Sequence, residues 1–209
     1  MLRTACCLPL LLLLASSCAH YQDVPVPPQV DLTRYPAVGL VRFASNSGRA
    51  YDAYATQKFL QHVTQAQQVR IIDLGTVEQA LAGVGMPQFD AAAMRAIGAK
   101  YGVQAVFNGT VEFTGASPSV SLSSFGSLGV HAEVQGTLTA TLYETQAGAI
   151  LWTDTSADRA SAGGITLDPG SVGVDVSSVD NAYTRMIGRM SFHVTDSFRT
   201  HWVRHRIDG

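Results

Sequence analysis

Residues Asp90–Gly109 read DAAAMRAIGAKYGVQAVFNG, and this stretch decides the fold class. It predicts a short helix that starts at Asp90 and ends at Tyr101–Gly102, because an acidic residue suits a helix start and a glycine suits a helix end. The apolar run Val103–Phe113 follows at once and predicts a strand. A helix that leads directly into a strand is typical of sheets whose strands are joined by crossover helices.

The rest of the chain shows the same two patterns. Short runs of apolar and β-branched residues predict further strands, and we place these at Ala37–Phe43, Val69–Leu74 and Ala149–Thr153. Apolar residues at helical spacing predict helices, and we place these at Tyr51–Ala66, Thr76–Val84 and Val179–Val203. Three glycines are expected to end helices as caps, and these are Gly83, Gly85 and Gly102.

A long alternating segment indicates antiparallel pairing. In Leu128–Tyr143, apolar residues such as Leu138 occupy one face and polar residues such as Thr139 occupy the other. The turn Thr145–Gly148 then leads into a return strand. The predicted fold class is therefore mixed α/β, a sheet in two or three layers with crossover helices, an antiparallel hairpin near the C-terminal part and a long C-terminal helix.

Two segments, at about residues 116–134 and 163–176, extend beyond a minimal domain. In each segment apolar residues alternate with small polar ones around a turn, at Phe125–Ser127 and at Asp168–Gly170. Both segments predict hairpins with one apolar face. Their arms are shorter than the roughly 9 to 11 residues that a membrane strand needs. We therefore expect them to contact a partner or a neighbouring subunit.

The N-terminus has the features of a cleavable export signal. Arg3 precedes the apolar run Leu8–Leu14, three small residues follow, and Cys18 comes next. The apolar run is shorter than the roughly 20 residues of a spanning helix. Residues 1–17 are therefore predicted to be a lipoprotein signal peptide, and Cys18 is predicted to carry the lipid.

Residues 18–36 are predicted to form an extended, proline-rich tether. Its prolines, from Pro25 to Pro36, favour a polyproline-type chain with a rise of about 3.1 Å per residue, so its full reach is roughly 50 Å. Residues 37–209 are predicted to form a single domain. Ala19, rather than an aspartate, follows the cysteine, which in the common Gram-negative sorting pattern indicates the outer membrane.

Charge and cysteine content narrow the classes of function. The chain has 14 Lys and Arg residues and 16 Asp and Glu residues, and removal of Arg3 with the signal leaves a balance of −3. That balance indicates neither nucleic-acid binding nor polybasic contact with a membrane. Cys6 and Cys7 leave with the signal, so the mature chain cannot form an internal disulfide and its fold depends on a hydrophobic core.

Four passages, taken in order, resemble the CsgG-like and TolB-amino-terminal-like group of envelope domains, whose members include the activator LpoB and the exopolysaccharide lipoprotein PelC. The passages are Val38–Phe43, Val69–Val84, Asp90–Gly109 and Leu138–Trp152. The resemblance implies a domain that binds other proteins or assembles with copies of itself rather than performing chemistry. It also implies two alternatives, an oligomeric outer-membrane secretion channel of the CsgG type and an activator of peptidoglycan synthesis of the LpoB type.

The sequence shows no catalytic set. The mature chain has no cysteine nucleophile, no Gly-x-Ser-x-Gly elbow, no Walker loop and no His-Glu-x-x-His pair. His201 and His205 stand four residues apart around the end of the expected C-terminal helix and could share a helix face. There the helix dipole favours basic residues, which explains them better than a metal site does. Asp154 and Asp158 are interpreted as solvated residues without a partner.

The sequence therefore predicts a non-enzymatic accessory lipoprotein on the periplasmic side of the outer membrane, with no cofactor and no bound metal. Its expected partners are the membrane, through the lipid anchor at Cys18, and other envelope proteins or copies of itself, but not nucleic acid. An enzyme with an unrecognised site is the remaining class. The residues that would test it by alanine substitution are His131, Glu133, His201 and His205.

Overall fold

The computed structural model describes residues 20–122, 128–168, 171–174 and 176–207. These residues belong to two compact units, which we describe separately. The first, called the terminal ribbon, contains strands β1 (His20–Val26) and β9 (His201–Ile207). The second, called the α/β unit, runs from Gln29 to Arg199. The predicted signal peptide and Cys18 lie outside the described residues.

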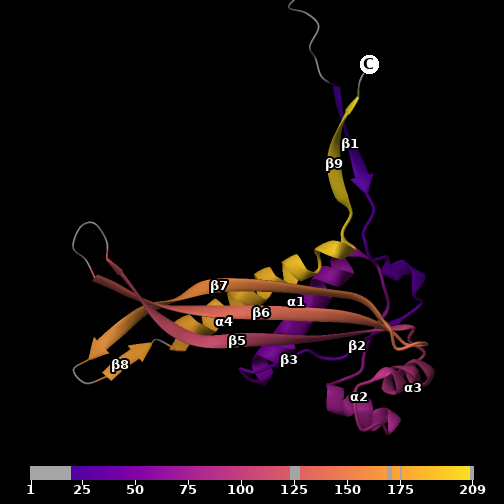
Figure 1. The fold of residues 1–209 in the computed structure, drawn as a ribbon, viewed down its shortest axis with the longest axis horizontal. Helices are drawn as coiled ribbons and strands as arrows, with labels where there is room; N and C mark the ends of the chain where they lie inside the picture. Colours follow the sequence, from indigo (N-terminus) through magenta and orange to yellow (C-terminus); the bar gives the residue numbers. More distant parts are fainter. Residues whose placement is uncertain (1–19, 123–127, 169–170, 175, 208–209) are drawn as a thin grey trace, which may run out of the picture. The chain divides into compact units, whose positions relative to one another are not determined.

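The α/β unit is built on a mixed sheet with the strand order β4-β2-β5-β6-β7-β8 (Figure 1). Its strands are β2 (Val38–Leu40), β3 (Ala44–Ser45), β4 (Ile71–Asp73), β5 (Ala105–Leu122), β6 (Leu128–Glu144), β7 (Ile150–Asp168) and β8 (Ser171–Val174). Strands β2, β4 and β5 are parallel, and short β3 also runs parallel to β5. Strands β5 to β8 pair antiparallel in sequence order. The predicted mixed α/β class is confirmed.

Four α-helices join or follow these strands in the described chain. They are α1 (Arg49–Ala66), α2 (Val77–Val84), α3 (Ala91–Tyr101) and α4 (Val176–Val194). Thr76 caps α2 in a reciprocal capping box with Gln79, and the Asp90 carboxylate accepts two N–H groups at the start of α3. Gly85 and Gly102 end α2 and α3 in the left-handed conformation, as expected. Gly83, also expected as a cap, instead lies inside α2, because Gly85 already supplies the left-handed position.

The C-terminal helix is present, but it ends earlier than the expected Val203. Helix α4 ends at Val194, and a 3-10 turn, η3 (Asp196–Phe198), follows it. The Thr195 hydroxyl donates to the Ser191 carbonyl at 2.7 Å, and the Arg199 guanidinium donates to the Phe192 carbonyl at 2.9 Å. These side chains satisfy carbonyls that a helix end leaves without partners, so the chain can leave the helix there.

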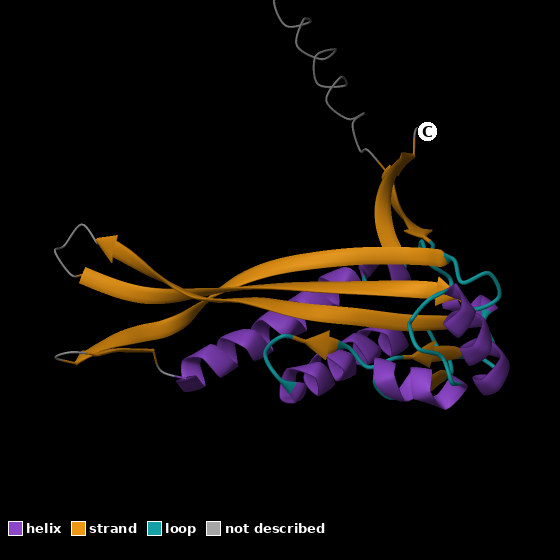
Figure 2. Ribbon diagram, turned by 60° about the horizontal axis from the view of Figure 1, so that its bottom comes forward, coloured by secondary structure: helices purple, strands orange, loops and turns teal. Residues whose placement is uncertain are grey.

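Helices cover the two faces of the sheet to different extents (Figure 2). Strand β5 shows this, because Phe107 is buried in the core beneath α1 and α4, whereas its neighbour Val106 is buried in a second core against α2 and α3. The first core is rich in aromatic rings, with the centroid of Phe107 5.1 Å from that of Phe59 and 5.7 Å from that of Phe198. The unit therefore has three layers at one end and two along the rest of the long strands.

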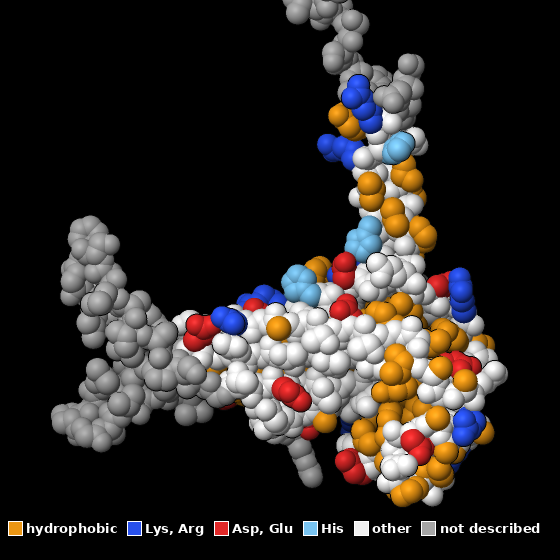
Figure 3. All heavy atoms as spheres, in the orientation of Figure 1, with side chains coloured by type: hydrophobic (Ala, Val, Ile, Leu, Met, Phe, Trp, Pro, Cys, Tyr) orange, Lys and Arg blue, Asp and Glu red, His pale blue; other side chains and the backbone are white. Residues whose placement is uncertain are grey.

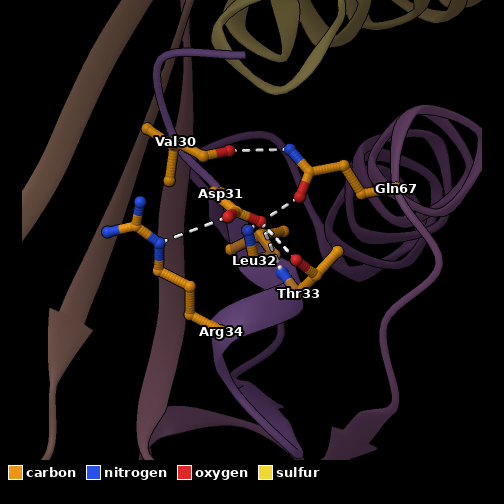
Figure 4. Close-up of polar contacts among 6 residues, drawn as sticks. All are labelled: Val30, Asp31, Leu32, Thr33, Arg34 and Gln67. Carbon is orange, nitrogen blue, oxygen red and sulfur yellow. Dashed lines mark hydrogen bonds and ion pairs between the residues drawn. The ribbon is translucent and has the colours of Figure 1, made fainter. Parts of the chain in front are cut away.

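Part of the expected tether belongs to the α/β unit (Figure 4). Leu32 lies in a 3-10 turn, η2 (Leu32–Arg34), and its side chain is fully buried in the first core. The Gln67 side chain donates to the carbonyls of Val30 at 2.6 Å and Phe198 at 2.9 Å, and it accepts the Leu32 N–H at 2.7 Å. One amide group thus joins the start of the unit, the end of α1 and η3.

The other part of the expected tether forms a strand. His20–Val26 pairs antiparallel with His201–Ile207 along its whole length. Proline lacks the N–H that an internal strand needs, but a two-stranded ribbon consists of edge strands only, which tolerate Pro25. An extended tether over all of residues 18–36 and a single domain over residues 37–209 are therefore not what the described residues form.

Candidate functional site

The carboxyl ends of parallel strands are where open α/β sheets bind ligands, and a cleft of about 680 Å³ lies there. Its lining residues come from the segment that follows β2, which includes the start of β3, and from the starts of α1 and α2, and they are Arg42, Phe43, Ala44, Asp52, Ala53, Thr76, Val77, Glu78 and Gln79. No sequence motif indicates this cleft, because its polar residues are spread over three separate segments.

An ion pair at the edge of this cleft holds the turn that follows β4. The Arg42 Nη2 lies 2.7 Å from Asp73 Oδ2, and Asp73 Oδ1 accepts the Gly75 N–H at 2.8 Å. The hydrogen bond from Arg42, aided by that from Gly75, holds the pKa of the Asp73 carboxyl below its usual value, against a smaller opposing effect of burial. Both side chains are about half exposed, so their contribution to stability is small.

Several other polar groups at the cleft position the two helix starts. The Thr76 hydroxyl accepts the Gln79 N–H, and a hydrogen bond from Thr76 lowers the pKa of Glu78. The Thr56 hydroxyl accepts the Phe43 N–H at 2.9 Å and donates to the Asp52 carbonyl at 2.7 Å. The lining residues include no histidine, cysteine or serine, and the hydroxyl of the one threonine among them, Thr76, is engaged in the cap of α2.

Where their side chains are described, the residues singled out in β6 and β7 each have a separate contact. Glu133 lies 3.8 Å from Arg159 across the two strands, while the His131 side chain lies outside the described side chains. The sequence interpretation of Asp158 as a solvated residue without a partner is wrong. Its carboxylate lies 2.6 Å from the Arg189 guanidinium of α4. Asp154 accepts the N–H of the adjacent Thr155.

His201 and His205 lie in strand β9 rather than at a helix end. In the ribbon they are opposite Val26 and Gln22, and both are exposed. The helical interpretation failed because Phe198 and Trp202 continue the apolar spacing of α4 although the helix has already ended. Within the described chain, no group of three or more His, Cys, Asp and Glu side chains is arranged to hold a metal ion.

A long strand edge distinguishes the α/β unit more than its cleft does. From Ile150 to Gly164, strand β7 pairs with β6 on one side, and β8 pairs with its other side only from Ile165 onward. At the start of this edge the Ile150 side chain is 63% exposed and Leu151 is 43% exposed. The sequence predicts a strand here. No local sequence pattern indicates the order of strands in a sheet, and this order decides which strand lies at an edge.

The adjoining outer face of β5, β6 and β7 carries hydroxyl groups. The side chains of Thr139 and Thr155 lie 3.1 Å apart across β6 and β7, and those of Thr141 and Thr153 are also 3.1 Å apart. These threonines lie on the face opposite the buried Leu138, away from the core under α1 and α4. The outer face is therefore polar, as is usual for an antiparallel sheet that meets solvent on one side.

Comparisons with known proteins give only distant likenesses. No family model matches the chain, and no curated protein matches it. Similar solved structures include a PelC dodecamer from Paraburkholderia phytofirmans, with 13% identity over 86% of this chain and 98% of that chain and a TM-score of 0.45. They also include lipoprotein GNA1162 from Neisseria meningitidis, with 15% identity over 60% of this chain and 83% of that one and a TM-score of 0.39.

The C-terminal domain of LpoB from Salmonella enterica is a further likeness, with 14% identity over 64% of this chain and 84% of that chain and a TM-score of 0.36. TM-scores of this size do not assign a family. The described residues thus define a mixed α/β unit whose polar groups are mostly held in structural contacts. Among the described helices, none has both the length and the apolar character needed to cross a membrane.

Proposed function

We propose that this chain is a non-enzymatic lipoprotein of the bacterial outer membrane, anchored through Cys18 and facing the periplasm. In this proposal the α/β unit binds protein partners or copies of itself within a cell-envelope assembly or secretion machine. The observation that carries the binding role is the long edge of β7, which pairs with β6 alone from Ile150 to Gly164.

The edge of β7 suits recognition by strand addition. Backbone N–H and C=O groups on the outer side of an edge strand can pair with a strand of another chain. The exposed side chains of Ile150 and Leu151 supply apolar contact at one end of the edge. Asp158 shares a sheet face with buried Gly136 and is held by Arg189, and inward charges of this kind limit indiscriminate pairing of edges.

Site-specific photocrosslinking tests the binding role. A photoreactive side chain at Ala157, exposed on β7, should crosslink the mature lipoprotein in the envelope to a protein partner or to a second copy. The same group at Gln65, exposed on α1, is the matched control and should give no such product. A monomeric mass in mild detergent together with no crosslink from Ala157 would contradict the proposal.

Lipidation and location are tested independently of binding. Metabolic labelling with a palmitate analogue should mark the wild-type chain and not a Cys18→Ala variant, and density-gradient fractionation should place the labelled chain with the outer membrane. An unlabelled wild-type chain would contradict the anchor, and a labelled chain in the inner membrane would contradict the location.

An oligomeric secretion channel is a second candidate, favoured by the two hairpins that continue past the core. Strands β5 and β6 pair as far as Leu122 and Leu128, and β7 and β8 make four further pairs between Ile165–Asp168 and Ser171–Val174. Four pairs fall short of the roughly 9 to 11 residues of a membrane-crossing strand. A detergent-extracted ring that conducts ions in bilayers would establish the channel, and a soluble monomer of residues 19–209 would exclude it.

An LpoB-type activation of peptidoglycan synthesis is less well supported. By resemblance, such an activator uses a long flexible linker to reach a synthase in the inner membrane. Here most of the chain between Cys18 and Gln29 is occupied by paired strand β1, so we favour a role close to the outer membrane. Crosslinking of the α/β unit to an inner-membrane synthase would contradict this preference.

A further inference from the structure

The terminal ribbon carries apolar side chains that the described chain does not cover. Its exposed residues include Trp202 at 67%, Tyr21 at 58%, Val203 at 52%, Val26 at 42% and Val24 at 41%. Figure 3 shows apolar side chains following one another along this ribbon between basic and histidine side chains. Since an isolated two-stranded sheet is at best marginally stable in water, contact with something outside the described chain would stabilise the ribbon.

The register places these side chains on both faces of the ribbon. Val24 lies opposite Val203 on one face, while Pro25 lies opposite Trp202 on the other. Tyr21 pairs with Arg206 and Asp23 pairs with Arg204 on the same face as Trp202, so this face combines two aromatic rings with two guanidinium groups and one carboxylate. Tryptophan and tyrosine are the residues that collect at membrane–water interfaces, because each has an apolar body and a polar group.

The chain length between Cys18 and β1 restricts where the ribbon can be. The first described strand residue, His20, is separated from Cys18 only by Ala19. A fully extended chain spans at most about 3.6 Å per residue, so Tyr21 lies within about 11 Å of Cys18. Each headgroup layer of a bilayer is about 5 to 7 Å thick. If acyl chains on Cys18 enter the bilayer, the Tyr21 end of the ribbon therefore lies at or next to the headgroups.

We propose that the terminal ribbon is a membrane-contacting element, whose Tyr21 and Trp202 side chains enter the interfacial layer of the phospholipid bilayer that holds the Cys18 lipid. This inference rests on the proposed lipid anchor. The occupant is a lipid surface rather than a protein, because the ribbon begins beside the predicted acylation site and carries interfacial residues. Asp23 lies 3.7 Å from Arg204, and with Arg206 the described ribbon has a formal charge of only +1 apart from its histidines, so charge contributes little to the attraction. Contact is therefore expected with neutral lipids.

The chain contains its own reporter for this contact. It has two tryptophans, of which Trp152 packs against the aromatic core of the α/β unit and Trp202 is exposed in the ribbon. The mature lipidated protein is reconstituted into phosphatidylcholine vesicles whose acyl chains carry bromine close to the headgroups. Because bromine quenches only nearby tryptophans, wild-type emission should be quenched severalfold more than that of a Trp202→Phe variant, which retains Trp152 as the matched control.

A second position tests the contact nearer the anchor. In the Trp202→Phe background, a Tyr21→Trp substitution should restore quenching by brominated lipid, whereas an Ile150→Trp substitution at the exposed start of β7 should not. Equal quenching of wild type and Trp202→Phe, or accessibility of Trp202 to aqueous iodide that vesicles leave unchanged, would overturn the membrane contact. Shielding of Trp202 from both bromine and iodide, together with a dimeric mass, would assign the ribbon to a second copy and would also overturn it.

Mass spectrometry of the N-terminal peptide tests the lipid anchor at Cys18 separately from the membrane contact of the ribbon. Acylated Cys18 with an unquenched Trp202 would overturn the ribbon contact alone and leave the lipoprotein proposal intact. Unmodified Cys18 would overturn the anchor, and with it the chain-length argument that brings the ribbon to the bilayer.

Discussion

The α/β unit and the terminal ribbon use apolar strand residues in opposite ways. In β5 of the unit, Phe107 is 1% exposed and Val106 is fully buried, because helices cover both faces of the sheet at that point. In β9 of the ribbon, Trp202 is 67% exposed and Val203 is 52% exposed. The strand sequences are equally apolar at these positions, so the difference lies in what packs against them.

The comparison indicates where each part obtains its stability. The two cores of the α/β unit are buried without any partner, so its free energy of unfolding should depend on its own side chains. The ribbon has no comparable core among its described residues, and its order should depend on contacts from outside. Substitutions in each part test whether its stability comes from its own side chains or from outside contacts.

The largest expected effect comes from the aromatic core. Phe107→Ala should lower the free energy of unfolding by about 3–5 kcal/mol, because it removes a fully packed ring and leaves a cavity beside Phe59 and Phe198. Trp202→Ala, which removes an even larger ring from the ribbon, should leave that free energy almost unchanged in urea unfolding of residues 19–209. A similar loss of stability in both variants would show that Trp202 is also packed within the chain.

The next effect tests the boundary of the α/β unit at Gln67. Gln67→Ala should cost about 2–3 kcal/mol, because the buried N–H of Leu32 and the carbonyls of Val30 and Phe198 lose their partner. Gln68→Ala, at the exposed neighbouring position, is the matched control and should change stability little. If both variants unfold at the same urea concentration, residues 30–32 contribute no stability and the unit begins later than Gln29.

Local signals in the sequence predicted much of this unit. The cap at Thr76, the cap at Asp90 and the glycine end at Gly102 all involve residues close together in sequence, and all are found where expected. The alternation in β6 correctly separates buried residues such as Leu138 from the outer threonines. These features depend on one segment at a time, so composition and spacing are enough to predict them.

The features that were missed depend on residues far apart in the chain. Gln67 gives no sign in the sequence that it bonds to Val30 and Phe198, because these partners come from separate segments. The pairing of β1 with β9 joins the two ends of the described chain, and prolines in β1 indicated an extended tether instead. Likewise, the Asp158–Arg189 pair in the α/β unit required knowledge of how α4 packs on β7.

A smaller effect concerns the Tyr51 phenol, which donates a hydrogen bond to Asp180 and lies between the rings of Phe113 and Tyr183. Burial, followed by the bond to Asp180, raises the pKa of Tyr51 from 10.0 to about 12. Between these values the unfolded chain loses the proton first, so the stability from this group is present below pH 10 and is lost as pH rises toward 12.

Tyr51→Phe should cost about 0.5–1.5 kcal/mol at neutral pH, the usual value of one hydrogen bond. An ultraviolet absorbance titration should also show one fewer phenol ionising late in the variant. Unchanged titration curves would mean that this tyrosine is as solvated as an exposed residue, which would weaken the contrast with the ribbon.

The smallest expected effect compares one ion pair in each part. Arg42 and Asp73 lie 2.7 Å apart in the α/β unit, with side chains 50% and 55% exposed, whereas Arg204 and Asp23 lie 3.7 Å apart in the ribbon at 74% and 63%. Asp73→Asn should cost about 0.2–1 kcal/mol at neutral pH, and Asp23→Asn should cost nothing measurable.

The stabilising effect of the Arg42–Asp73 pair should also depend on pH, because Arg42 lowers the pKa of Asp73 in the folded state. This effect is present above the ordinary value of 3.8 and is lost as pH falls through the lowered pKa. The difference between wild type and Asp73→Asn in urea unfolding should therefore disappear in strong acid. An equal cost for Asp23→Asn would show that the ribbon is held by its own contacts, and the membrane would no longer be needed to order it.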